Sequence, residues 1–312
     1  MIIVKLQGGL GNQMFQYALG RALSLRTKSD VLFDKSWFAH VPDGETKRPF
    51  ELDVFPLSLN FARQKDIPLE VGGNYYSFRN AILRKLPWRP IVGLPSWNFI
   101  SDHFPKAQES IANICAGENV YLQGYWQSEK YFKDTLDVIR HEFSFQTSPD
   151  QVNQNILNKI LKEEVQGIKA VSIHIRRGDY SSDPKTNAHH GLLSLDYYRS
   201  AMSLIEKKLP KVCYYIFSDD LAWCRENLSI NSEAVFVDVN TGNPSGMDLR
   251  LMSACHHQII ANSSFSWWAA WLNANKNKIV IAPQEWLSDP SLINKDLLPE
   301  NWIKLSTPET QG

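Results

Sequence analysis

The C-terminal half of the chain alternates short apolar runs with amphipathic ones, and this alternation constrains the fold more than any other feature. Runs rich in β-branched and aromatic residues predict strands, and apolar residues at helical spacing predict helices. The predicted order is strand 170–175, helix 195–208, strand 212–217, helix 221–228, strand 234–237, helix 247–255, strand 258–261, helix 265–274 and strand 278–282. Strands and helices in this order form βαβ units around a parallel sheet. Ligands of such sheets bind beyond the carboxyl ends of the strands, so the residues following each strand are the first candidates for a functional site.

The N-terminal half begins with a similar unit and then becomes irregular. We predict a strand at 2–6, a glycine turn at 8–11, a helix and a strand at 31–34. Segments rich in Pro and aromatic residues between 37 and 119 predict loops and short helices. Helices at 129–141 and 149–164 follow, and the domain boundary is expected between them. The length suits two domains of about 150 residues, so we expect an α/β protein with domains 1–150 and 151–312 and a cleft between them.

Charge, apolar segments and cysteines exclude several classes of protein. Lys plus Arg and Asp plus Glu number 33 each, a balance that argues against nucleic-acid binding. No apolar run is long enough for a transmembrane helix, and the N-terminal residues predict a strand rather than a signal peptide. The four cysteines lack metal-ligand or disulfide spacing and are expected to be buried thiols in a reducing compartment: Cys115, Cys213, Cys224 and Cys255. We therefore expect a cytoplasmic protein, with peripheral attachment to the inner membrane left open.

Two adjacent arginines follow the strand at 170–175. Arg176 and Arg177 stand at its predicted carboxyl end, where two cations are costly to place unless an anion meets them. A diphosphate would satisfy them, because the guanidinium group donates paired hydrogen bonds to phosphate oxygens. The alternative is a pair of solvated surface charges with Asp179 as a local partner.

A second polar segment, Asn262 to Ser266, joins the strand at 258–261 to the next helix. Helix capping explains one of its hydroxyl groups but not all of them. A helix N-terminus also offers N–H groups and the positive end of the helix dipole, which suit a phosphate. The tryptophans that follow, Trp267, Trp268 and Trp271, are expected in the core.

The glycine turn after the first strand leads into Gly11, Asn12 and Gln13. Met14 stands where a dinucleotide-binding fingerprint needs its third glycine, and no GK[ST] sequence follows, so a phosphate-binding P-loop is excluded. Two interpretations stay open: the backbone approaches a ligand beside two neutral amide side chains, or the glycines only make a tight turn.

Asp219 and Asp220 follow the strand at 212–217. An acidic residue in this position commonly binds the ribose or base of a nucleotide, whereas Asp220 is expected to cap the next helix. The chain has no Asp-x-Asp sequence, the spacing with which many nucleotide-sugar transferases hold a divalent cation. An enzyme of that class with this sequence would use arginine in place of the metal.

Together these segments resemble the bacterial α-1,2-fucosyltransferases. The family pattern includes GGLGNQMFQYA, His-x-Arg-Arg-Gly-Asp-Tyr, Phe-Ser-Asp-Asp and Ser-Ser-Phe-Ser-Trp-Trp, which stand here at 8–18, 174–180, 217–220 and 263–268. Only the region of about 40–120 lacks a recognisable motif. The resemblance implies a GT-B-like fold of two Rossmann-like lobes, with GDP-fucose bound by the C-terminal lobe and most of the acceptor side in the N-terminal lobe.

The resemblance also implies roles for individual residues. Arg176 would grip the diphosphate with Arg177 beside it, and His174 and Asp219 would address the guanosine. The remaining implied donor-binding residues are Ser263, Ser264 and Phe265 at the helix start and Gly11, Asn12 and Gln13 in the glycine turn. No metal or other cofactor would be required.

The reaction implied is transfer of fucose from a β-linked donor to the 2-hydroxyl of a galactoside, with inversion. Arg176 and the helix start would stabilise the departing GDP, each well-aimed donor contributing about 3 kcal/mol. The base that deprotonates the acceptor is expected to be Asp179 or His190, with Asp183 behind them. Lactose, N-acetyllactosamine and O-antigen galactosides all stay open as acceptors. The alternatives are a fucosyltransferase of another linkage and a non-catalytic sugar- or nucleotide-binding protein of the same fold.

Overall fold

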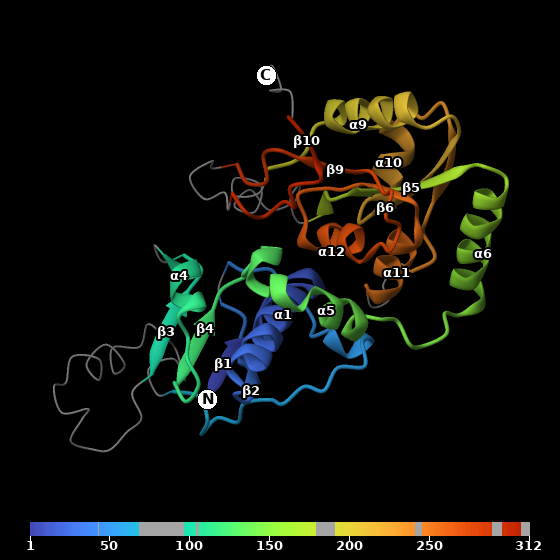
Figure 1. Cartoon of the computed structure of the whole chain (residues 1–312). Coiled ribbons are helices and arrows are strands. Elements are labelled where there is room, and N and C mark those ends of the chain that lie inside the picture. Colours follow the sequence, from blue (N-terminus) through green and yellow to red (C-terminus); the bar gives the residue numbers. More distant parts are fainter. Residues whose placement is uncertain are drawn as a thin grey trace, which may run out of the picture. The chain divides into compact units, whose positions relative to one another are not determined.

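The chain forms two compact units, Met1–Glu142 and Phe143–Gly312. The computed structural model describes residues 1–42, 44–68, 97–103, 106–178, 191–240, 245–288 and 295–306. Each unit contains one parallel sheet with helices packed against it (Figure 1). The α/β class predicted for both halves is therefore confirmed.

Unit 1 (Met1–Glu142) is built on a four-stranded sheet of order β2-β1-β4-β3. Helix α1 (Leu10–Thr27) connects β1 to β2 and buries Met14, Phe15, Ala18 and Leu19. The strands are β1 (Ile2–Lys5), β2 (Val31–Asp34), β3 (Asn98–Ser101) and β4 (Val120–Gln123). The shorter elements are α2 (Ser36–Ala39), η1 (Leu52–Val54), α4 (Ala107–Ala112), η3 (Glu129–Thr135) and α5 (Leu136–Glu142).

The prediction of loops and short helices between 37 and 119 was wrong for β3, and β4 was not predicted either. Both strands have four residues, too few for a clear period-two pattern. They form because β4 pairs with β1 on one side and with β3 on the other. The stabilising contacts are therefore distant in sequence.

Unit 2 (Phe143–Gly312) has a six-stranded sheet of order β10-β9-β8-β5-β6-β7. Its strands are β5 (Lys169–Ile175), β6 (Val212–Ser218), β7 (Glu233–Phe236), β8 (His257–Ile259), β9 (Val280–Pro283) and β10 (Ile303–Leu305). Its helices are α6 (Gln151–Val165), α9 (Leu195–Lys208), α10 (Leu221–Asn227), α11 (Gly246–Ala254) and α12 (Ser264–Leu272). The predicted strands and helices of this half are confirmed, with ends displaced by about two residues at most. Among the described elements of this unit, β10 alone was not predicted.

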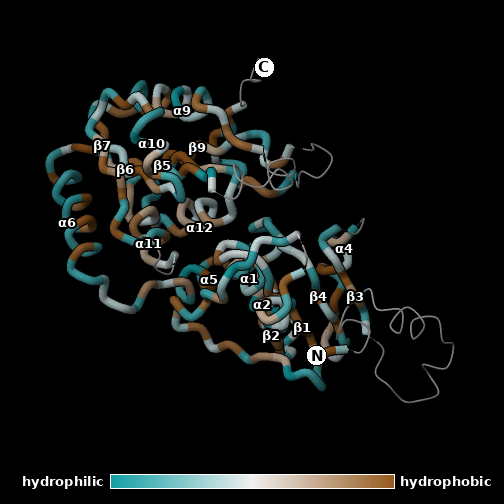
Figure 2. The backbone as a smooth tube through the Cα atoms, turned by 180° about the vertical axis from the view of Figure 1, so that it is seen from behind, coloured by the Kyte–Doolittle hydropathy of each residue, from teal (hydrophilic) through white to brown (hydrophobic). Residues whose placement is uncertain are grey.

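The core of unit 2 lies between its sheet and its helices. Helices α9 and α10 cover one face of the sheet and α11 and α12 the other (Figure 1). Figure 2 shows apolar residues concentrated on inner strands such as β6, whereas the outer helix α6 is largely polar. Trp267, Trp268 and Trp271 are buried, as expected for core residues. Within the described ranges, no helix combines the length and apolar character that a membrane span requires.

Each sheet has one point where the strand order reverses. In unit 2 the chain adds β6 and β7 on one side of β5 and then returns to place β8 on the other side. In unit 1 it adds β2 on one side of β1 and later places β4 on the other. Ligands of open parallel sheets bind at such switch points, beyond the carboxyl ends of the strands. The segments after β5 and β8, and those after β1 and β4, are therefore the candidate ligand-binding positions.

Candidate functional site

Arg176 and Asp219 form the centre of the unit 2 switch point. Arg176 follows β5 and Asp219 follows β6, and these strands are paired up to their last residues. Nη1 of Arg176 lies 2.8 Å from Oδ2 of Asp219, and the two side chains are 21% and 26% exposed. The arginine is thus held in place but stays accessible to a ligand from solvent.

The Asp219 carboxylate also organises the backbone after β5. Its Oδ1 accepts a hydrogen bond from the Arg177 N–H at 2.8 Å. Burial disfavours ionisation of Asp219, but Arg176 and the N–H groups of Gly178 and Arg177 outweigh it, and the pKa of the carboxyl group is lowered. A Cβ atom at Gly178 would lie 2.6 Å from Oδ2 of Asp219, so a larger residue there would displace the carboxylate. The carboxylate therefore holds both the arginine and the turn that carries it.

Arg177 has surroundings quite different from those of Arg176. Its guanidinium lies over the Trp223 ring, 3.7 Å from the centroid, with Nε 3.7 Å from Oδ2 of Asp220. Asp220 also caps α10 by accepting a hydrogen bond from the Trp223 N–H, which confirms its predicted role. Arg177 thus packs against α10. Sequence analysis missed Trp223, because nothing near it in the chain indicates its stacking partner.

His174 is a buried histidine beside this ion pair. It is 6% exposed, and Nδ1 has no hydrogen-bond partner among the described residues. Burial lowers the pKa of the imidazole, with Arg176 adding to the effect and Asp219 opposing it. The ring is therefore neutral near pH 7. Its neighbour is Phe265, at 5.7 Å between ring centroids, so β5 and the start of α12 meet at this point.

The N-terminus of α12 lies at the carboxyl end of β8. Ser263 is the N-cap residue, but its side chain makes no capping hydrogen bond within the described part of the chain. The Ser266 hydroxyl bonds back to the carbonyls of Ala261 and Ser263 rather than to the first-turn N–H groups. The first turn can therefore donate to an anion.

The glycine turn of unit 1 holds its two amide residues differently. Gln13 is fully buried, and its amide bonds to Gly8 O, Pro49 O and Glu51 N at 2.9, 2.9 and 3.0 Å. Asn12 is half-buried, and its Oδ1 accepts a hydrogen bond from Nε2 of Gln127 at 2.7 Å. Sequence analysis missed Gln127, which is 115 residues away along the chain.

The remaining predicted residues are the candidate bases for the acceptor hydroxyl. Asp179, His190 and Asp183 fall outside the described residues, so their expected role stays a prediction. Of the cysteines, Cys213, Cys224 and Cys255 are buried free thiols as expected. Cys115 is exposed, because it lies in the turn after α4 and not in a strand or helix.

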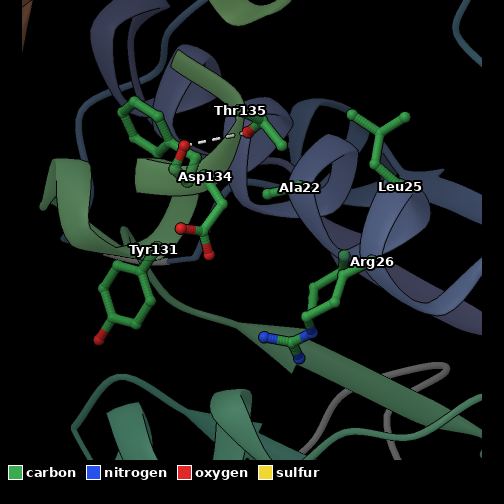
Figure 3. Close-up of a pocket in the computed structure, with 8 residues that line it drawn as sticks. Ala22, Leu25, Arg26, Tyr131, Asp134 and Thr135 are labelled. Atoms are coloured by element: carbon green, nitrogen blue, oxygen red, sulfur yellow. Dashed lines mark hydrogen bonds between the residues drawn. The ribbon is translucent and has the colours of Figure 1, made fainter.

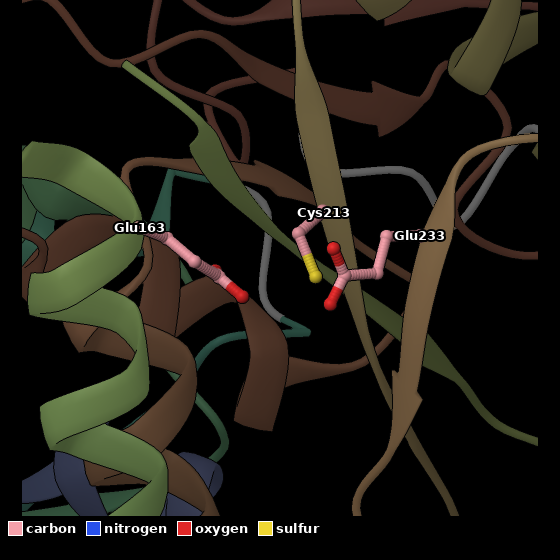
Figure 4. Close-up of side chains that lie close together, drawn as sticks. All are labelled: Glu163, Cys213 and Glu233. Atoms are coloured by element: carbon pink, nitrogen blue, oxygen red, sulfur yellow. The ribbon is translucent and has the colours of Figure 1, made fainter. Parts of the chain in front are cut away.

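Glu163, Cys213 and Glu233 form a cluster of metal-ligand types within the described ranges (Figure 4). Their ligand atoms lie within 4.8 Å of one another. The Lys159 ammonium, however, is 3.0 Å from Glu233 and 3.6 Å from Glu163, and so already supplies a cation. Cys213 and Glu233 lie at the amino ends of β6 and β7, whereas Arg176 follows the carboxyl end of β5. This group is therefore separate from the switch point.

A shallow pocket of about 270 Å³ lies in unit 1 between α1 and η3 (Figure 3). Residues of the last turns of α1, including Ala22, Leu25 and Arg26, line it together with Tyr131 and others of η3. Asn12 is in the first turn of the same helix. The pocket is thus remote from the glycine turn.

The match to a family model and the similarity to curated relatives indicate one family. The family model described as Glycosyl transferase family 11 matches residues 97–306. The alpha-1,2-colitosyltransferase of Escherichia coli is 32% identical over 98% of this chain and 99% of its own length. The galactoside 2-alpha-L-fucosyltransferase SEC1 of Bos taurus is 27% identical over 62% of this chain and 50% of its own length. Among solved structures, the NodZ alpha-1,6-fucosyltransferase of Bradyrhizobium soaked with GDP-fucose has a TM-score of 0.45 and 15% identity, over 87% of this chain and 91% of that chain.

Proposed function

Because the chain belongs to glycosyl transferase family 11, we propose that it transfers L-fucose from GDP-β-L-fucose to the 2-hydroxyl of a terminal galactoside, with inversion. One observation carries the proposal: the Arg176–Asp219 pair stands at a switch point of the sheet beside the neutral His174, whose Nδ1 has no hydrogen-bond partner among the described residues. This arrangement suits a nucleoside diphosphate, whose charge needs a fixed cation and whose base needs hydrogen-bonding groups.

We assign the diphosphate to Arg176 and to the first turn of α12 at Ser263 and Ser264. Asp219 fixes the guanidinium fork, so the arginine can meet phosphate oxygens without losing side-chain freedom on binding. The uncapped N–H groups of α12 supply further donors.

The base of the nucleotide is assigned to His174 and Phe265. Nδ1 of His174 is buried with no hydrogen-bond partner in the part of the chain that the structure describes, and the aromatic ring beside it offers a face for a purine. Asp219 is engaged by Arg176 and the backbone, so we give it a positioning role rather than contact with guanosine. Arg177 likewise acts through its stack on Trp223.

In unit 1, Gly11 and Asn12 are proposed to contact the donor. Gln13 acts indirectly, because its amide is used in holding the turn to the segment that includes Pro49. The acceptor is proposed to bind to this unit, and Asp179 or His190 is proposed to deprotonate it.

The reaction proposed is a single displacement. The acceptor 2-oxygen bonds to C1 of fucose as the C1–phosphate bond breaks, the hydroxyl proton passes to the base, and the electron pair leaves on GDP. Arg176 and the α12 first turn stabilise the charge on GDP, which is the task of a divalent cation in metal-dependent transferases. We therefore propose that no metal ion is required.

A second candidate is transfer of colitose, and the 32% identical colitosyltransferase favours it. Colitose is fucose without its 3-hydroxyl group. A site that hydrogen-bonds a hydroxyl strongly rejects an analogue that lacks it, whereas a site without that contact discriminates little. Donor choice therefore separates the two candidates.

The test compares GDP-fucose with GDP-colitose on lactose, N-acetyllactosamine and an O-antigen galactoside, with product linkage determined by NMR. We expect an α-1,2-linked fucoside and a kcat/KM at least tenfold higher for GDP-fucose. A preference for GDP-colitose would show that colitose, and not fucose, is the sugar transferred. Another linkage would show that the acceptor hydroxyl is not the 2-hydroxyl. Donor binding without transfer or hydrolysis would favour the non-catalytic alternative.

A further inference from the structure

The switch point of unit 1 carries a pair of amide side chains, of which the donor assignment uses Asn12 and leaves Gln127 without a role. Asn12 lies in the first turn of α1, the helix that follows β1, and Gln127 comes from the loop after β4, the strand beside β1. Nε2 of Gln127 donates to Oδ1 of Asn12 at 2.7 Å. The bond therefore joins the two segments at which a parallel sheet of this order binds its ligands.

The loop from Gly124 to Gln127 is held in one conformation. Gly124 has a φ of 153°, and a Cβ atom there would overlap the Asp102 carboxylate. Oδ2 of Asp102 accepts the N–H groups of Tyr125 and Trp126 at 2.6 and 3.3 Å. Trp126 has a φ of 55°, unusual for a bulky side chain. Such strain persists only where surrounding contacts impose it.

The glycine turn is tied to the same loop from the other side. Nε2 of Gln16 donates to the Gly124 carbonyl at 2.9 Å, and Oε1 accepts the Gln7 N–H at 3.0 Å. Gln16 is fully buried. The backbone of Gln127 and the backbone of Asn12 are thus fixed relative to each other before any ligand binds.

The hydrogen bond decides which end of the Asn12 amide is available. Oδ1 is used by Gln127, whereas Nδ2 lies against Gly8 and has no hydrogen-bond partner in the described part of the chain. An amide N–H attracts an anionic oxygen, and an amide oxygen repels it. The observed orientation is the one that a diphosphate needs.

We infer that Gln127 is a positioning residue that fixes the Asn12 amide so that its N–H, and not its oxygen, meets an anionic oxygen of the donor diphosphate. The inference rests on the proposed function, because it takes Asn12 as a donor-binding group. The loop from Gly124 to Gln127, which the Asp102 carboxylate holds, keeps Gln127 at the required place.

The test is Gln127→Glu, read out by GDP affinity in calorimetry. A carboxylate only accepts hydrogen bonds, so Asn12 would turn, donate Nδ2 to it and present Oδ1 to the ligand. The contact survives, and GDP affinity should fall at least tenfold. Gln127→Ala leaves the amide free to rotate and should lose less. A purely structural bond predicts the opposite order, because Ala removes the contact and Glu keeps it.

Two further variants separate amide orientation from the added negative charge. In an Asn12→Ala background, Gln127→Glu should weaken GDP binding less than twofold, since no amide remains to be turned. Gln154→Glu is the matched control, because Nε2 of Gln154 donates to Oδ1 of Asn158 at 2.9 Å on the exposed surface of α6, and its GDP affinity should be unchanged.

Equal losses from Gln127→Glu with and without Asn12 would overturn the inference, as would retention of affinity by Gln127→Glu. Fucose transfer, measured separately on the wild-type protein, keeps the two proposals distinguishable. Transfer without the expected pattern of GDP affinities overturns the role of Gln127 alone. The pattern without fucose transfer supports that role and overturns the proposed reaction.

Discussion

At the residue scale, the least expected feature is a pair of histidines kept neutral inside unit 2. Burial lowers the pKa of His174, and it lowers the pKa of His257 to about 4, with His256 and Lys169 adding to the effect. Nε2 of His257 and Nδ1 of His174 are both buried without partners among the described residues. Each ring therefore resists protonation in the folded protein but not in the unfolded chain.

This difference predicts a loss of stability in mild acid. The ordinary pKa of a histidine in an unfolded chain is 6.5, so protons bind the unfolded state first as pH falls below this value. The contribution of neutral His257 is complete above about 6.5 and is lost as pH falls towards about 4, at roughly 1.4 kcal/mol per unit of pKa difference. Urea titrations should show the free energy of unfolding falling across this window, and less steeply in His257→Gln. A slope identical in the two proteins would contradict the assignment.

At the element scale, the sequence predicted well those strands and helices whose own residues carry the pattern. The β5, β6 and α9 segments have long apolar or amphipathic runs, and the structure agrees with them. Strands β3, β4 and β10 escaped prediction because they are short and are stabilised by partners that are distant in the chain.

The residues of the candidate site likewise divide into those that the sequence predicts and those that only the structure reveals. Arg176 and Ser264 could be located because polar residues after an apolar strand mark the ligand edge of a parallel sheet, whereas His174 lies within β5 and was indicated only by the family resemblance. The stack of Arg177 on Trp223, the engagement of Asp219 and the Asn12–Gln127 bond could not, because each joins separate elements through side-chain geometry.

The turn after β5 gives a prediction at this scale. Gly178→Ala would place a Cβ atom 2.6 Å from Oδ2 of Asp219, so the carboxylate must move away from Arg176. We expect a stability loss of about 1–3 kcal/mol and at least a tenfold loss of GDP affinity. In an Asp219→Ala background the same substitution should cost little more, because the clash is already gone. Additive losses in denaturation and calorimetry would show that the two residues act separately.

At the scale of the whole molecule, the two units share one construction. Each has a parallel sheet with polar side chains at its switch point, Asn12 in the first turn of α1 in unit 1 and Arg176 after β5 in unit 2. The described cluster of possible metal ligands in unit 2, Glu163, Cys213 and Glu233, lies near the amino ends of the strands, and Lys159 already pairs with its carboxylates. In the proposed site, the diphosphate therefore meets arginine and backbone N–H groups rather than a metal ion.

The most direct test of this assignment is GDP binding measured by calorimetry in excess EDTA, on the wild-type protein, Arg176→Lys and Arg176→Ala. The wild-type protein should bind GDP with the same affinity in EDTA as with added Mg²⁺. Both variants should lose at least tenfold, about 1.4 kcal/mol, because lysine keeps the charge but not the fork that Asp219 holds. Denaturation curves matching the wild-type protein would confirm that the variants are folded. Binding that collapses in EDTA and returns only with Mg²⁺ or Mn²⁺, or normal affinity in Arg176→Lys, would contradict the account.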